Sequence, residues 1–221
     1  MTFFQQILKL LQTYSDIYLR GFFGTIRLSV ITMCLAVVLG TLVSLAKNGK
    51  SRILKGVINV YIEILRGTPP LLQLYFFWIL LPKVLPFELS DTVCILTALI
   101  VNASAYVAEV IRAGIQAVDP GQREAALSLG MSERNMMMRI ILPQAIRNIL
   151  PAMGNEFINI IKGTSLASVF FINELTTSYR TVQSATFLAL PSIMIAGMIY
   201  LVLNYVLSRG VAAVERRLAV D

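Results

Sequence analysis

Charged side chains stand inside stretches of this sequence that are otherwise strongly apolar, and they are the residues that could do chemistry. Two carboxylates have a cation three residues further on, Glu63 with Arg66 and Glu109 with Arg112. At this spacing, opposite charges meet on one face of a helix. Glu156 stands in a third polar group. Such groups either neutralise one another as ion pairs or bind a ligand that carries both charges, and the sequence leaves both alternatives open.

The residue types that metal or acid–base chemistry needs are scarce. The chain has no histidine, which removes the commonest metal ligand and the commonest general base at neutral pH. Cys34 and Cys94 are far apart, each inside an apolar run, and we interpret them as membrane-buried structural thiols. The sequence therefore predicts no metal site, no catalytic residue and no cofactor bound by this chain.

The composition indicates a membrane protein. Hydrophobic residues make up 57% of the 221 residues and charged residues only 14%, and the mean hydropathy is +0.74. Soluble domains carry about 25% charged residues, and a membrane-spanning helix needs about 20 mostly apolar ones. We predict an all-α integral membrane protein, a single transmembrane domain over 1–221. Its five predicted spans are 22–46, 54–81, 92–118, 146–171 and 187–207.

Two segments depart from a plain span. The second predicted span is interrupted by Gly67-Thr68-Pro69-Pro70, and because proline disrupts a helix interior, we expect a broken or kinked helix there. Residues 1–20 place apolar residues at helical spacing among charged ones but lack the uninterrupted core of a cleavable signal. We expect an amphipathic helix at the membrane interface.

Basic residues orient the chain. Eleven lysines and arginines, Lys50 among them, follow spans one, three and five, whereas only Lys83 and Arg180 follow spans two and four. The basic side of a membrane protein is cytoplasmic, so we predict the N-terminus outside and the C-terminus inside. The net charge of +7 is spread between apolar runs rather than gathered in one patch, so nucleic acid is not an expected partner.

A polar segment, residues 119–143, separates spans three and four. Pro120 and Gly121 predict a turn out of the membrane, and a short helix should follow over 122–129. Gly130 suits the position just after a helix end, and Ser132 suits the N-cap of the next helix. On the predicted orientation, this helix pair lies in the cytoplasm.

Several motifs in the sequence together resemble one family. Glu124-Ala125-Ala126, with Gly130 and Ile141-Leu142-Pro143 beyond, resembles the EAA loop of permease subunits of bacterial ABC importers. Residues 65–73, LRGTPPLLQ, and residues 102–118, NASAYVAEVIRAGIQAV, resemble the polar amino-acid (histidine/arginine/glutamine-type) branch of that family. Pro70 departs from its pattern, which often has leucine there. The resemblance runs from about residue 20 to the C-terminus.

The resemblance implies a multi-pass permease of the bacterial cytoplasmic (inner) membrane. Such a subunit forms the pathway for a polar or charged amino acid delivered by an external binding protein. Its partners would be a dimer of cytoplasmic ATP-binding subunits, which hold ATP and Mg, and a second copy or a related permease. The residues that match the loop, and through which coupling to the ATPase is implied, are Glu124, Ala125, Ala126 and Gly130.

Buried polar residues suggest where a substrate passes. Charged residues in spans usually face the bundle interior or a water-filled cavity, and broken helices of transporters supply binding sites at mid-membrane. Glu109 would accept an ammonium group, and Arg66 beside the break would attract a carboxylate. The predicted pathway residues are Arg66, Thr68, Gln73, Asn102, Glu109, Asn155 and Glu156.

Two other functions remain as alternatives. An ion-coupled secondary amino-acid transporter would normally contain an internal repeat, and none is visible. A membrane-embedded enzyme would need a cluster of acid, base or metal ligands in the membrane, which scattered carboxylates without histidine do not supply. We therefore expect a transport subunit and not an enzyme, with ATP hydrolysis on a separate partner.

Overall fold

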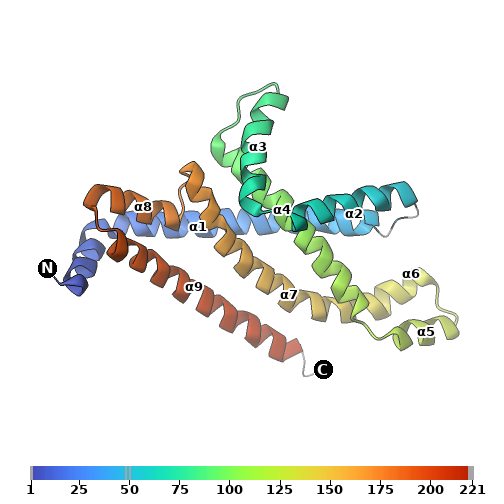
Figure 1. Cartoon of the computed structure of the whole chain (residues 1–221). Coiled ribbons are helices and arrows are strands. Elements are labelled where there is room, and N and C mark those ends of the chain that lie inside the picture. The colour runs from blue at the N-terminus through green and yellow to red at the C-terminus, as the bar shows by residue number, and fades with distance from the viewer. Residues whose placement is uncertain (1, 48, 50, 219–221) are drawn as a thin grey trace.

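The computed structural model describes residues 2–47, 49 and 51–218, and these residues form helices and connecting turns without any strand. Lys50, one of the basic residues counted above, lies outside the described residues. A long helix, α1 (Phe3–Lys47), runs through the molecule, and the other long helices pack against it from several directions (Figure 1). The predicted all-helical architecture is confirmed.

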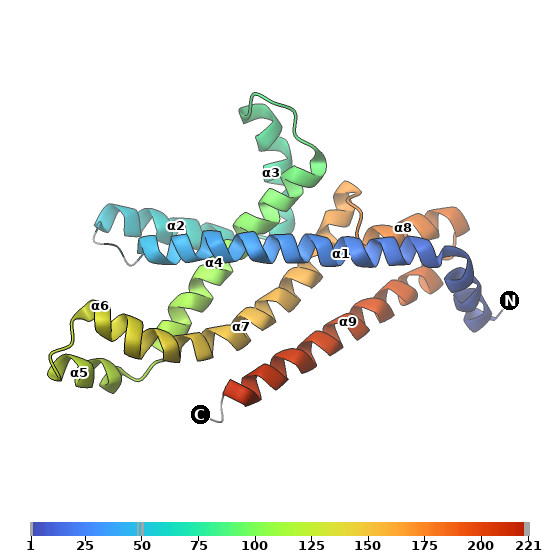
Figure 2. The ribbon, with the colours of Figure 1, turned by 180° about the vertical axis from the view of Figure 1, so that it is seen from behind.

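Helix α1 changes direction at Tyr14, whose backbone (φ −121°, ψ 17°) is not helical. The first turns therefore point away from the axis of the rest of α1 (Figure 2). This break precedes residue 20, where the predicted N-terminal segment ends. The placement of that segment at the membrane interface stays a prediction.

One face of α1 is lined by small residues that let other helices approach closely. Helix α4 (Asp91–Gln116) crosses it at Gly40, where a Cβ atom would lie 2.8 Å from the Ser104 carbonyl oxygen and 2.6 Å from Val107 Cγ1. Small residues are the usual means of close packing between helices in a bilayer. The buried small residues of this stripe are Gly21, Thr25, Ser29, Thr32, Ala36 and Gly40.

The predicted break in the second span is present, and it is sharper than a kink. Helix α2 (Arg52–Gly67) ends before the proline pair, and α3 (Pro70–Val84) begins at Pro70, with 113° between the two helices. Proline fits the first position of a helix because its missing N–H group has no intrahelical partner there. The chain thus leaves α2 and turns steeply into α3, which stands away from α1 (Figure 1).

The polar segment between α4 and α7 (Leu142–Gly163) folds into short helices. Helix α5 (Pro120–Ser128) is followed by a turn at Gly130, whose φ of +77° favours glycine. Helix α6 (Glu133–Met136) follows, with Ser132 as its N-cap, and continues through a π-helical turn, η1 (Met137–Ile141), into α7. The predicted short helix and the Ser132 N-cap are present. The turn predicted at Pro120 and Gly121 is wrong, because these two residues begin α5 and the chain turns before them, at residues 117–119; proline fits the first position of a helix.

The chain after α7 contains a helix that the sequence reading missed. The fourth predicted span, 146–171, ends as a 3₁₀ helix, η2 (Thr164–Phe170), and α8 (Leu175–Thr186) then lies beside the first half of α1. Helix α9 (Ala189–Leu218) continues beyond residue 207, where the fifth predicted span ends.

Glu174 fastens α8 to its neighbours. Its fully buried carboxylate caps α8 by accepting hydrogen bonds from the backbone N–H groups of Thr176 (2.7 Å) and Thr177 (2.5 Å), and it accepts another from the hydroxyl of Tyr200 on α9 (2.9 Å). On the α1 side, Thr25 Oγ1 accepts from the Leu175 N–H (3.1 Å). Burial raises the pKa of the Glu174 carboxyl, and these donors oppose that rise.

Three helices are long and apolar enough to cross a membrane: α1, α4 and α9. The bent pair α2–α3 meets the same standard only when its halves are taken together, and among the described residues α7 does not meet it. Helix α7 carries Arg147, Glu156 and Lys162, which lower its hydropathy. The described helices thus include several apolar spans, and the count of five stays a prediction.

Candidate functional site

A cavity of about 290 Å³ lies where α1, α3, α4 and α7 meet. Its walls combine apolar side chains with a few polar groups, which is typical of small-molecule sites. Pro70 places the start of α3 at the cavity, so the helix break itself forms one wall. The lining residues are Thr32, Pro70, Leu74, Leu99, Asn102, Ala103, Tyr106, Glu156, Asn159, Ile160, Gly163 and Leu166.

Glu156 is the only charged residue among those that line the cavity. Its Oε2 accepts a weak hydrogen bond from Asn159 Nδ2 (3.5 Å), one turn further along α7. Across the cavity, Thr32 Oγ1 is buried and has no hydrogen-bond partner among the described residues. The Glu156 carboxylate is therefore the charged acceptor that the cavity offers to a polar ligand, whereas the Thr32 hydroxyl is covered by its neighbours.

Gln73 holds the helix break in shape. Its Nε2 donates to the Leu65 carbonyl oxygen (2.9 Å), the Thr68 carbonyl oxygen (3.2 Å) and Thr68 Oγ1 (2.8 Å). Its Oε1 accepts from Asn102 Nδ2 on α4 (2.9 Å). The last carbonyls of a helix have no partner within it, so Gln73 satisfies groups that the break would otherwise leave bare.

Glu109 on α4 pairs with two arginines, Arg112 on the same helix and Arg66 on α2. Arg112 Nε donates to Glu109 Oε2 (2.9 Å), Arg112 Nη2 contacts Oε1, and Arg66 Nη1 lies 3.7 Å from the same oxygen. Arg66 also stacks over the ring of Tyr106, with its Cζ 5.5 Å from the ring centroid. Of the two ion pairs considered from sequence, the structure contains Glu109–Arg112; Glu63 is in no salt bridge among the described residues.

The structure brings only part of the predicted pathway set together. Asn102 and Glu156 line the cavity, whereas Thr68 and Gln73 lie in the hydrogen-bond network behind its wall. Arg66 and Glu109 lie beyond Tyr106 and outside the lining, and Asn155 is exposed on α7 and does not line the cavity.

Three polar lining residues, Thr32, Tyr106 and Asn159, are outside the predicted pathway set, and two of them, Thr32 and Tyr106, were not considered from the sequence at all. Thr32 is an ordinary threonine in an apolar run, and Tyr106 lies within a stretch read only as a family signature. Of the two, only Thr32 had a signal, its place in the stripe of small residues on α1.

Helix α5 has one face packed against the start of α7 and another face that is exposed. Ala126 is buried in a cluster with Met136 and Ile141, which fastens α5 to the start of α7. Glu124 and Ala125 are exposed on α5, and Leu129 at its end is 83% exposed. A single exposed apolar side chain is common on protein surfaces, so this exposure by itself does not identify a partner surface.

No group of three or more metal-ligating side chains is found among the described residues.

Residues 19–220 match the family described as binding-protein-dependent transport system inner membrane component. The chain is 37% identical over 200 residues to the arginine transport system permease protein ArtQ of Bacillus subtilis. The matched residues cover 90% of this chain and 91% of that protein. The L-cystine transport system permease protein TcyB of the same organism is 35% identical over 211 residues, covering 94% and 88%.

A solved structure has the same fold. The crystal structure of an amino acid ABC transporter with histidines superposes with a TM-score of 0.91 at 38% sequence identity, covering 96% of this chain and 98% of that one. The likeness therefore extends over nearly the whole length of both chains.

Proposed function

The chain belongs to the family of binding-protein-dependent transport system inner membrane components, and from that premise we propose that it carries a polar or charged amino acid. Members of the family are permease subunits of ATP-driven importers of the inner membrane rather than enzymes, and ATP is hydrolysed on a separate subunit. The family assignment favours this function over an ion-coupled secondary transporter and over a membrane-embedded enzyme.

The observation that carries the proposal is the cavity beside Glu156. Its volume of about 290 Å³ is near the lower end of the range for small-ligand pockets, about 300–1,000 Å³, which suits a single amino acid. Glu156 would accept the ammonium group or a cationic side chain, and Asn102 and Asn159 would add hydrogen bonds. Relatives named for arginine and cystine transport support an amino acid as cargo.

The helix break has a supporting part in this proposal. Thr68, Gln73 and Asn102 fix the angle between α2 and α3 and so the position of the wall that Pro70 forms. Arg66 and Glu109 form an ion pair outside the cavity lining, and Arg66 stacks over Tyr106, which lines the cavity. We assign no direct contact with the ligand to Arg66, Glu109 or Asn155, because none of the three lines the cavity.

The membrane arrangement is part of the same proposal. Five spans, with α2–α3 as one broken span and α7 as a polar-faced one, place the N-terminus outside and the C-terminus inside. The segment 119–143 is then cytoplasmic, and Glu124, Ala125, Ala126 and Gly130 seat it on an ATPase dimer that binds ATP and Mg. The external binding protein docks on the opposite side.

A second permease, identical or related, completes the pathway, because one chain of this size forms only part of a wall. The face of α9 that carries Gly197, Tyr200 and Asn204 is suited to that contact. It borders a cavity of about 500 Å³ with Lys162 and Ser165, and Asn204 Oδ1 there has no partner among the described residues. A partner chain would supply the missing donor.

The proposal is tested by rebuilding transport from parts. The permease is reconstituted in proteoliposomes with its ATPase inside and its binding protein outside, and uptake of radiolabelled arginine, glutamine and cystine is measured with and without ATP. We expect uptake of one class of amino acid that requires ATP and all components. Uptake by the permease alone under an ion gradient would contradict the proposal.

A further inference from the structure

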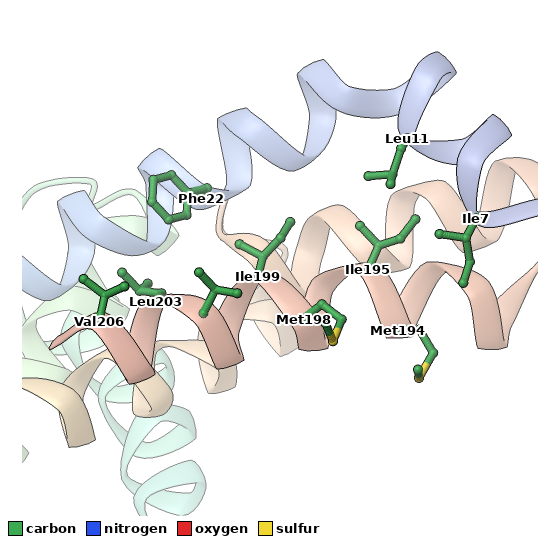
Figure 3. Close-up of a pocket in the computed structure, with 10 residues that line it drawn as sticks. Ile7, Leu11, Phe22, Met194, Ile195, Met198, Ile199, Leu203 and Val206 are labelled. Atoms are coloured by element: carbon green, nitrogen blue, oxygen red, sulfur yellow. The ribbon is translucent and has the colours of Figure 1, made fainter. Parts of the chain in front are cut away.

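An apolar groove runs between the first part of α1 and α9. It has a volume of about 650 Å³. Figure 3 shows Ile195, Ile199 and Leu203 of α9 turned toward Phe22 and Leu11 of α1, with Ile7 near the Met194 end. Every side chain that lines it is a hydrocarbon or a thioether, and Met198, Val202 and Val206 form an exposed rim.

The occupant of this groove follows from the medium that it faces. Both walls belong to helices apolar enough to span a membrane, so the groove opens to bilayer hydrocarbon and not to water. Lining atoms without a neighbour lose their dispersion contacts, and the groove has no polar group that would hold water in place. We propose that it binds an acyl chain of a phospholipid from the leaflet on the N-terminal side.

The dimensions of the groove fit one acyl chain. Met194 and Val206, at its two ends on α9, are twelve residues apart, which corresponds to about 18 Å along a helix at 1.5 Å per residue. The hydrocarbon of one leaflet is about 15 Å deep, half of the bilayer core. A chain lying along α9 therefore fills the groove over roughly the thickness of its own leaflet.

The kink at Tyr14 closes one end of the groove. It directs residues 3–13 toward the start of α9, where Ile7 packs in the same cluster as Ile195 and Leu10. This segment carries a single charged side chain, Lys9, which is exposed and in no salt bridge among the described residues.

A second copy of the chain is a poorer occupant. The face of α9 opposite the groove has the small and polar residues Gly197, Tyr200 and Asn204, which are the residue types that join helices within a bilayer. The groove face has only branched apolar residues and methionines, whose packing gains little over that of lipid. We therefore expect the groove face of α9 to contact lipid and the opposite face to contact protein.

The test fills the groove and counts the lipid. Val202→Trp places an indole on the rim of the groove, and Val38→Trp is the matched control, because Val38 on α1 is 60% exposed against 57% for Val202 and lies outside the groove. The permease–ATPase complex is reconstituted with palmitoyl-oleoyl phosphatidylglycerol and phosphatidylethanolamine, extracted in mild detergent and analysed by native mass spectrometry. We expect about one retained phospholipid per permease in wild type and control, and about a fivefold lower fraction in V202W. Equal retention in all three proteins would overturn the proposal.

Two further measurements guard against a variant that folds poorly. Added phosphatidylglycerol should raise the thermal midpoint of delipidated wild-type complex and of V38W but not of V202W; an equal rise in V202W counts against the groove. In a C34S/C94A background, a disulfide between two copies through Met198→Cys would place protein in the groove and overturn the proposal.

Discussion

Replacing Glu156 by glutamine removes the one charged side chain among the described residues that line the cavity, while its size and its contact with Asn159 are nearly preserved. A hydrogen bond to a charged group contributes about 1.5–3 kcal/mol, which corresponds to a change of about 10- to 150-fold in Kd. We therefore expect E156Q to weaken amino-acid binding by at least about tenfold. The same change should leave the thermal midpoint nearly unaltered, because no salt bridge among the described residues involves Glu156.

Glu109→Gln is the matched control for this experiment. It is the same substitution on a neighbouring helix, at a carboxylate paired with Arg66 and Arg112 and outside the cavity lining. The two arginine side chains are 42% and 34% exposed, so screening limits the pairs to about 1 kcal/mol or less of stability. We expect a small loss of stability in E109Q and a Kd within about twofold of wild type.

The assay must exclude the binding protein, whose own affinity would mask the site in the permease. Equilibrium binding of the radiolabelled amino acid to the purified permease–ATPase complex meets that need, with thermal unfolding measured on the same samples. A Kd for E156Q within twofold of wild type, or an equal increase in E109Q, would refute the assignment of Glu156 to the ligand.

Three further substitutions test the scaffold. Gln73→Glu should destabilise the protein more than Gln73→Leu, because it turns a carboxylate toward the Leu65 and Thr68 carbonyl oxygens. For Gln73→Leu we expect a loss of about 1–3 kcal/mol in the free energy of reversible unfolding. If Gln73→Leu were the more destabilising of the two, the proposed hydrogen-bond network would be wrong. Gly40→Ala should lower the free energy of unfolding by about 1–3 kcal/mol, because the added methyl group overpacks against Ser104 and Val107. The thermal midpoint should therefore fall. Gly56→Ala is the control and should not lower it, because Gly56 has open space around it. Glu174→Gln turns an amide N–H₂ group toward donors whose hydrogen bonds the carboxylate now accepts. Because α8 then loses part of its attachment, protease cleavage near α8 should become faster. Unchanged cleavage would argue against the role of Glu174 in holding α8 in place.

Local chemistry made part of this structure predictable. The break at Gly67–Pro70 follows from proline's missing N–H group and ring, and the turn at Gly130 from the left-handed backbone that glycine tolerates; both are found where the sequence placed them. The Glu109–Arg112 pair agrees with its helical spacing, although Glu63 and Arg66 have the same spacing and form no salt bridge with each other among the described residues. Each of these features depends on residues within one or two helical turns.

Distant contacts made the rest unpredictable. Helix α8 depends on Glu174 and on the bond between Leu175 and Thr25, residues 150 positions apart. The cavity exists because four helices meet, and Thr32 enters it through the packing of α1 against α4. Asn102 and Glu109 were both predicted to line the pathway from one span, yet Asn102 contacts Gln73 while Glu109 contacts Arg66 and Arg112. Which neighbours a polar face meets is set by tertiary packing and is not encoded in its spacing.

A density map of the assembled complex with its amino acid bound would test the account most directly. We predict density for the amino acid in the cavity between α1, α3, α4 and α7, with its ammonium or cationic side chain against Glu156. The same map should show the ATPase seated on α5 beside Glu124. An amino acid bound instead against Glu109 and Arg112, with the cavity beside Glu156 empty, would contradict the account.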